Sequence, residues 1–144
     1  MKKLVNLSIL GITALVFTAC TAGAPTPASA FKADEKALCD VSANGIAKVI
    51  ATAKEYNTVA QKEGVEFRRL SVNNSALIVS VEEAIKTGAK EVNPLTFKGK
   101  KSKTVLETNF AAERACKFAI AALAQKEYGK TNWKKAVPGD GYKY

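Results

Sequence analysis

Apolar residues recur at three- and four-residue steps in three separate stretches of the chain, which predicts three amphipathic helices. The stretches are residues 34–63, 75–87 and 104–128. Gly45 is the weak point of the first, because glycine costs up to about 1 kcal/mol against alanine inside a helix. A glycine follows each stretch directly, where it can end a helix: Gly64, Gly88 and Gly129. The pattern therefore predicts an all-α fold, a small three-helix bundle.

Polar residues mark where two of these helices are expected to begin. Asn74 or Ser75 is expected to cap the second helix. Thr104 followed by Glu107 fits a capping box at the start of the third. Val105 would then lie on the apolar stripe of that helix.

The region between the first two helices leaves a second fold open. Residues 67–72 and 76–81 are also compatible with a short β-hairpin near 67–81, because Val79 and Val81 favour strands. This alternative fold is α+β. Residues 89–103 are expected to form a loop, since Asn93–Pro94 and Gly99 interrupt it.

The N-terminal residues have a different character from the rest. Two lysines follow Met1, and an apolar run then extends from Leu4 to Phe17. A membrane span needs about 20 apolar residues, so this shorter run with a positive start predicts a secretory signal peptide.

The residues Phe17–Thr18–Ala19–Cys20 resemble the lipobox of bacterial lipoproteins, although that family prefers leucine where Phe17 stands. The resemblance covers only the N-terminal segment. It implies a signal peptide over residues 1–19 and a lipid anchor, with acyl chains such as palmitate, on Cys20. Because Thr21 is not aspartate, it also implies the outer membrane, facing the periplasm or the surface.

A second cleavage site is Ala28–Ser29–Ala30, an A-x-A motif that would release a soluble periplasmic or secreted chain beginning at Phe31. Under the lipobox interpretation, residues 20–33 form the anchor and a flexible tether, since 21–30 contain no bulky apolar side chain. The helical domain then spans 34–129, and 130–144 form a basic, aromatic tail.

The chain has three cysteines, Cys20, Cys39 and Cys116. Either cleavage site removes Cys20 from the count, and two cysteines remain in an oxidising compartment. The sequence therefore predicts a Cys39–Cys116 disulfide, with two buried reduced thiols as the alternative.

Charge and composition exclude several functions. The formal net charge is +9, with lysines concentrated in residues 86–103 and 126–144. The absence of histidine excludes Ser-His-Asp and Cys-His catalysis and imidazole metal sites. A basic surface suits anionic lipid, acidic envelope polymer or an acidic protein, unless it is simply solvated. Nucleic acid is not expected, because an exported protein does not ordinarily meet it.

Candidate binding residues are the lysines of the loop and the aromatic residues of the tail, because basic loops steer acidic partners and exposed aromatics anchor interfaces. They are Lys98, Lys100, Lys101, Lys103, Trp133, Tyr142 and Tyr144. The sequence contains no phosphate-binding loop, Cys-x-x-Cys pair or acidic metal cluster. No catalytic residue, metal ligand or cofactor is therefore expected.

These observations favour a noncatalytic, membrane-anchored envelope lipoprotein that binds another macromolecule, of the inhibitor, immunity or exclusion, or assembly-accessory type. The first alternative is a binder of anionic lipid or acidic polymer that uses the lysine-rich loop. The second alternative is the soluble secreted protein that cleavage after Ala30 would give.

Overall fold

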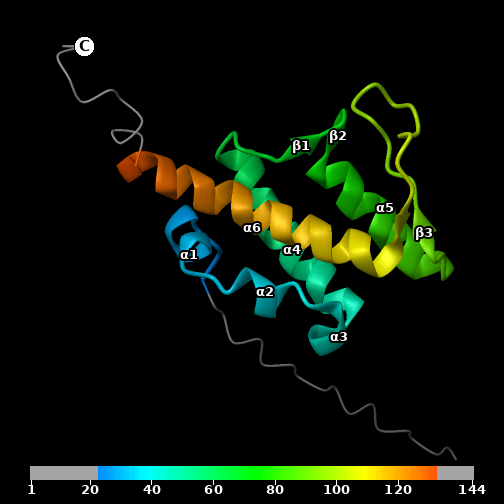
Figure 1. The fold of residues 1–144 in the computed structure, drawn as a ribbon, viewed down its shortest axis with the longest axis horizontal. Coiled ribbons are helices and arrows are strands. Elements are labelled where there is room, and N and C mark those ends of the chain that lie inside the picture. Colours follow the sequence, from blue (N-terminus) through cyan, green and yellow to red (C-terminus); the bar gives the residue numbers. More distant parts are fainter. Residues whose placement is uncertain (1–22, 133–144) are drawn as a thin grey trace, which may run out of the picture.

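The computed structural model describes residues 23–132, and these residues are mostly helical. The three main helices pack together (Figure 1) and are α4 (Ile46–Lys62), α5 (Asn74–Thr87) and α6 (Thr108–Asn132). Three short helices precede them: α1 (Pro27–Phe31), α2 (Glu35–Leu38) and α3 (Val41–Asn44). Two small antiparallel sheets pair β1 (Arg68–Arg69) with β2 (Val72–Asn73), and β3 (Glu91–Val92) with β4 (Leu106–Glu107).

The first predicted helix is broken into α2, α3 and α4. Gly45 takes a positive φ of 77°, which a continuous helix does not allow. Asp34 and Asp40 cap the two short helices, since the carboxylate of Asp34 accepts from the Ala37 amide and that of Asp40 accepts from the Ser42 amide. The prediction of one helix over 34–63 was wrong because the aspartates act as new helix starts.

The predicted flexible tether is partly folded. Thr26 and Ser29 form a capping box at the start of α1, where Pro27 takes a first-turn position. Ala30 is buried, and α1 packs against α6. The folded domain therefore begins before Asp34, and the extended-tether prediction is wrong for residues 27–31. Composition could not reveal this, because the contact partner lies at the far end of the chain.

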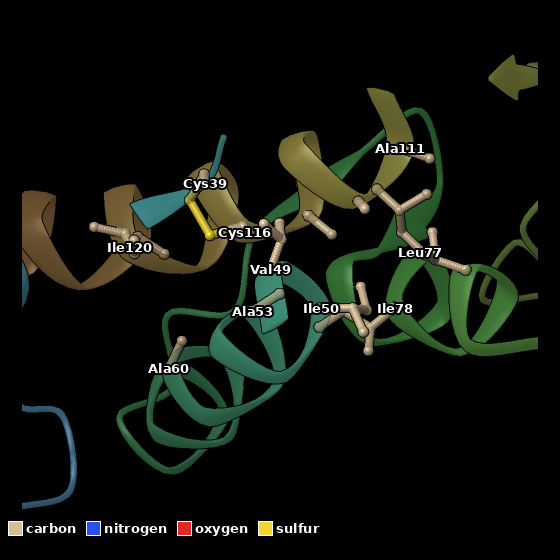
Figure 2. Close-up of a cluster of buried hydrophobic side chains, with 14 of the residues drawn as sticks. Cys39, Val49, Ile50, Ala53, Ala60, Leu77, Ile78, Ala111, Cys116 and Ile120 are labelled. Carbon is tan, nitrogen blue, oxygen red and sulfur yellow. A yellow bond between two sulfur atoms is a disulfide. The ribbon is translucent and has the colours of Figure 1, made fainter. Parts of the chain in front are cut away.

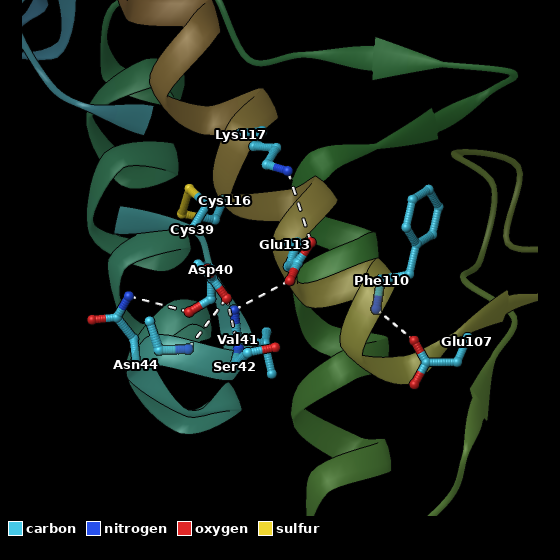
Figure 3. Close-up of polar contacts among 11 residues, drawn as sticks. Cys39, Asp40, Val41, Ser42, Asn44, Glu107, Phe110, Glu113, Cys116 and Lys117 are labelled. Atoms are coloured by element: carbon cyan, nitrogen blue, oxygen red, sulfur yellow. Dashed lines mark hydrogen bonds and ion pairs between the residues drawn. A yellow bond between two sulfur atoms is a disulfide. The ribbon is translucent and has the colours of Figure 1, made fainter. Parts of the chain in front are cut away.

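The start and end of α6 also differ from the prediction. Residues 106 and 107 form strand β4, and the helix continues past Gly129 to Asn132. Glu107 caps α6 directly, because its carboxylate accepts from the backbone amide of Asn109 and from that of Phe110 (Figure 3). Val105 precedes the helix and is exposed, so both the capping box from Thr104 and the stripe position of Val105 were wrong.

Helix α5 agrees with its predicted range, but its cap comes from Glu66, outside the predicted candidates. The Glu66 carboxylate accepts the Ser75 amide at 2.8 Å, whereas Asn73, at the N-cap position, makes no side-chain cap bond. Neither Asn74 nor Ser75 acts as the predicted cap. The alternative pairing of residues 67–72 with 76–81 was wrong, because 76–81 belong to the helix. A smaller hairpin is present in this region and pairs residues 68 and 69 with 72 and 73.

The core lies where α4 crosses α6 and is closed by α5 (Figure 2). Its centre consists of fully or almost fully buried side chains, among them Val49, Ala53, Val81, Ala112, Ala115, Ala119, Ile120 and Leu123. The alanines of α6 allow the close approach of α4. Cys39 and Cys116 are also fully buried and form the predicted disulfide, with 5.6 Å between their Cα atoms. This prediction is confirmed.

The segment after the disulfide is held on α6 by a second contact. The Val41 amide donates to the Glu113 carboxylate at 3.2 Å, and Lys117 lies 3.7 Å from the other oxygen of Glu113 (Figure 3). This contact occupies one face of α6 and leaves the face carrying Phe110 for the two small sheets. None of the helices in residues 23–132 combines the length and the apolar character needed to cross a membrane.

Candidate binding surface

The β1–β2 hairpin ends in an unusual turn. Leu70 and Ser71 form its two-residue tip, and their φ angles are 49° and 67°. Two positive φ values in a two-residue hairpin indicate a type I′ turn, which favours asparagine and glycine. A leucine there costs about 1 kcal/mol or more, and its side chain is 73% exposed. The strain is therefore not offset by burial of Leu70 in the described domain, which makes this tip a candidate for function.

The predicted loop over residues 89–103 contains strand β3, so the prediction was wrong for residues 91 and 92. Its remainder is a second tight turn, which we call the basic loop and define as residues 94–104. The Gly99 amide donates to the Thr96 carbonyl at 2.8 Å, and the Thr96 amide donates to the Lys100 carbonyl at 2.7 Å. Gly99 has a φ of 71°. The four predicted binding lysines, Lys98, Lys100, Lys101 and Lys103, are all exposed on this loop.

A backbone hydrogen bond joins the two tips. The Phe97 amide donates to the Ser71 carbonyl at 2.9 Å. The ring of Phe97 is 62% exposed. The tip of the hairpin and the basic loop therefore lie side by side (Figure 1).

A pocket opens between the hairpin, the basic loop and α6. Its volume is about 50 Å³. Its apolar lining comes from Phe67, Leu70, Val72, Leu77, Pro94, Leu106 and Phe118, and Arg69 and Arg114 also line it. Three segments that are distant in the sequence therefore meet around one small cavity.

Aromatic rings hold Arg114 in place at this pocket. Phe118 stacks on Phe67 with 4.0 Å between the ring centroids. The Arg114 guanidinium carbon lies 5.0 Å from the centroid of Phe118 and 5.8 Å from that of Phe110, within the range of cation–π attraction. Partial burial, and to a lesser extent the nearby positive charge of Arg69, lower the pKa of Arg114.

The arginines carry a charge that no acid in the described domain neutralises. The chain has three arginines, Arg68, Arg69 and Arg114, and none forms an ion pair within residues 23–132. Neighbouring acids are occupied elsewhere. Glu66 and Glu107 cap α5 and α6, and Glu113 binds the Val41 amide. The result is a fixed positive site.

Asn74, a buried amide that lines the pocket, belongs to a hydrogen-bond network in the core. The Asn74 side-chain nitrogen donates to the Asn57 side-chain oxygen at 3.0 Å and to the Ala115 carbonyl at 2.9 Å. Asn57 in turn donates to the Glu66 carboxylate at 3.1 Å. Burial tends to raise the pKa of Glu66, but its hydrogen bonds from Ser75 and Asn57 together outweigh this and lower the pKa. The network ties the hairpin to α4, α5 and α6.

We define the hairpin face by six residues at or beside the pocket: Arg69, Leu70, Phe97, Val105, Phe110 and Arg114. Arg69, Leu70 and Arg114 line it, Phe97 bonds to Ser71, Phe110 contacts Arg114, and Val105 lies in the chain between two lining residues. The four apolar side chains of the hairpin face are all more than half exposed. The predicted lysines share the basic loop with Phe97, although Lys101 lies on its other side, beside α5. Cys20, Trp133, Tyr142 and Tyr144 lie outside the described residues.

Sequence reasoning missed the arginines and the exposed apolar residues of this face. The adjacent Arg68–Arg69 pair was visible, but nothing in the sequence brought it to Arg114. Among residues 23–132 no cluster of three or more acidic or cysteine side chains is placed to hold a metal ion. Comparison of the chain with protein-family models, curated proteins and solved structures gave no match.

Proposed function

We propose that this chain is an envelope lipoprotein anchored through Cys20, and that its domain is a noncatalytic binding module for an acidic macromolecule. The observation that carries the proposal is the hairpin face, where two unneutralised arginines lie among four exposed apolar side chains. Arginine and aromatic residues are enriched in protein interfaces. Such a face suits an inhibitor, an immunity or exclusion protein, or an assembly accessory.

The position of α1 supports Cys20 as the mature N-terminus. Cleavage after Ala30 would cut α1, separate the Thr26–Ser29 capping box from the domain and remove the buried Ala30 side chain from α6. Cleavage before Cys20 leaves α1 complete. The buried disulfide supports an oxidising compartment.

Intact mass tests the anchor. We expect protein purified unreduced from its native membranes to begin at an acylated Cys20 and to be two hydrogens lighter than the reduced chain. A chain that begins at Phe31 without lipid would overturn the anchor and leave a soluble secreted protein.

Photo-crosslinking in cells tests the binding surface. A photoreactive residue at Leu70 or Phe97 is expected to give a discrete adduct with another protein. The same residue at Thr58, which is exposed on α4, is the matched control and should give none. Arg69→Glu should abolish the adduct at position 70. Equal adducts from positions 70 and 58 would contradict the proposal.

A second candidate is binding to anionic lipid through the basic loop, because exposed Phe97 directly precedes its exposed lysines, a combination that suits a membrane surface. Salt separates the two candidates. Binding to phosphatidylglycerol vesicles through lysines should collapse by a few hundred millimolar salt, whereas a packed protein interface should persist.

A further inference from the structure

We propose that the pocket beneath the hairpin face is the anchor site for an acidic protein segment. One aliphatic side chain of the partner enters the cavity, and a neighbouring carboxylate binds between Arg69 and Arg114. This inference rests on the proposed function, and it adds the chemistry by which the partner is recognised.

The size of the pocket favours a side chain over a lipid chain. The cavity is small, with a volume of about 50 Å³, which suits the tip of one side chain. An acyl chain would leave most of its length outside the cavity. The apolar lining from Leu77, Leu106 and Phe118 suits a branched aliphatic group.

The charge beside the pocket favours a carboxylate. Arg69 and Arg114 both line it, and neither has an acidic partner within the described domain. The carboxylates of Glu66, Glu107 and Glu113 hold backbone amides, and none of them forms an ion pair with either arginine within residues 23–132. Arginine binds planar carboxylates through two parallel hydrogen bonds. An external anion therefore completes this arrangement.

An acceptor at the pocket favours a peptide. Asn74 lines the cavity and is 98% buried, since only 2% of its surface is exposed. Its side-chain nitrogen donates to two carbonyl-type oxygens, which fixes the orientation of the amide, and its Oδ1 has no hydrogen-bond partner within residues 23–132. This oxygen is shielded from solvent in the free domain, so a backbone N–H of a bound segment supplies the missing donor only if the lining of the pocket opens.

The experiment is a ¹H–¹⁵N NMR titration of the full folded domain with two dipeptides that differ only in charge. The probe is acetyl-Leu-Asp-amide and the matched control ligand is acetyl-Leu-Asn-amide. We expect the probe to shift the amides of Leu70, Leu106 and Phe118, with a Kd in the millimolar range and at least tenfold below that of the control ligand.

Protein variants locate the effect. Arg69→Gln and Arg114→Gln should each remove the preference for aspartate, while the spectrum stays dispersed. Lys36→Gln removes the same charge from exposed α2, on the disulfide side of the domain, and should leave the preference unchanged. Equal affinity for both dipeptides, or shifts confined to other residues, would overturn the inference.

The outcomes also separate this inference from the proposed function. If the dipeptides show no preference but the crosslink at position 70 is present and depends on Arg69, the anchor site in the pocket is rejected. The proposal of a binding surface then stands. Displacement of the probe by phosphatidylglycerol vesicles at low salt would reject the peptide ligand in favour of lipid.

Discussion

The guanidinium of Arg114 lies over the ring of Phe118, with 5.0 Å between the guanidinium carbon and the ring centroid. Phe118 is itself held by its stack on Phe67. A long, flexible cation is thereby fixed at the pocket before any partner arrives. Pre-organisation of this kind lowers the entropy lost on binding.

Removing the stack should therefore weaken the domain. Phe118→Leu is expected to lower the free energy of unfolding by about 1–2 kcal/mol, because it loses both the aromatic pair and buried area. Phe110→Leu is the matched control. Phe110 also contacts Arg114 but is 52% exposed, and its loss should cost less than about 0.5 kcal/mol. Urea unfolding measures both, and equal effects would contradict the stack.

The strained tip predicts a stabilising change that harms binding. Leu70→Asn with Ser71→Gly installs the residues that a type I′ turn prefers, and we expect a gain of about 1 kcal/mol in unfolding free energy. If the tip serves binding, the same variant should lose the crosslink from Phe97. A variant of unchanged stability would show that the positive φ values cost little.

A glycine-to-alanine substitution is expected to destabilise the domain at Gly99 and to stabilise it at Gly129. Gly99→Ala places a side chain at a φ of 71° and should cost about 1 kcal/mol. Gly129→Ala lies inside α6, where an added methyl group meets nothing within 4 Å, and should stabilise by up to about 1 kcal/mol. Thermal unfolding of the two variants checks the sign. A stabilising Gly99→Ala would contradict the turn geometry of the basic loop.

The Glu66 carboxylate should make stability depend on pH. Its pKa is lower in the folded state than the ordinary value of 4.5, so its contribution is full above about pH 4.5 and is lost as the pH falls through the folded pKa. Glu66→Gln should therefore cost about 1 kcal/mol at pH 7, because charged acceptors bind more strongly than neutral ones. The difference from wild type should disappear in acid.

Urea unfolding across pH 2–7 measures this dependence. Glu83→Gln, on the exposed side of α5, is the control and should stay within about 0.5 kcal/mol of wild type at every pH. A Glu66→Gln deficit that persists in acid would mean that the geometry of the amide, rather than charge, is responsible.

The disulfide should contribute strongly to stability. It closes a loop over a sequence separation of 77 residues, which corresponds to about 4.5 kcal/mol in the chain-entropy model. The double variant Cys39→Ala and Cys116→Ala is expected to lose about 2–5 kcal/mol. Wild type in reducing agent should match it in urea unfolding, and an oxidised chain no more stable than the reduced one would contradict the expectation.

Local patterns predicted the parts of the fold that depend on local interactions. The range of α5 followed from its apolar stripe and from Gly88, which takes the left-handed conformation expected at a helix end. The Cys39–Cys116 disulfide was predicted because only two cysteines remain once Cys20 is set aside. In contrast, the apolar pattern over residues 34–63 continued through Gly45, so it gave no sign that Asp34 and Asp40 cap separate short helices.

The binding surface was harder to predict because it depends on contacts between distant segments. The lysines of the basic loop were visible as a charge run. The exposure of Leu70 and Phe97 was not visible, since apolar residues are expected to be buried unless the turn that displays them is recognised. Arg69 and Arg114 lie at the same pocket only because the hairpin packs on α6, and no sequence spacing encodes that packing.

The disulfide also determines how the domain responds to mechanical tension. A pull between the two ends of the described chain passes along α1 and α2 to Cys39, crosses the sulfur–sulfur bond to Cys116, and leaves through α6. Residues 40–115 lie outside this covalent path. Both arginines of the pocket, the hairpin tip and the basic loop are among them, so tension between the two ends of the described chain does not stretch the segments that form the binding surface.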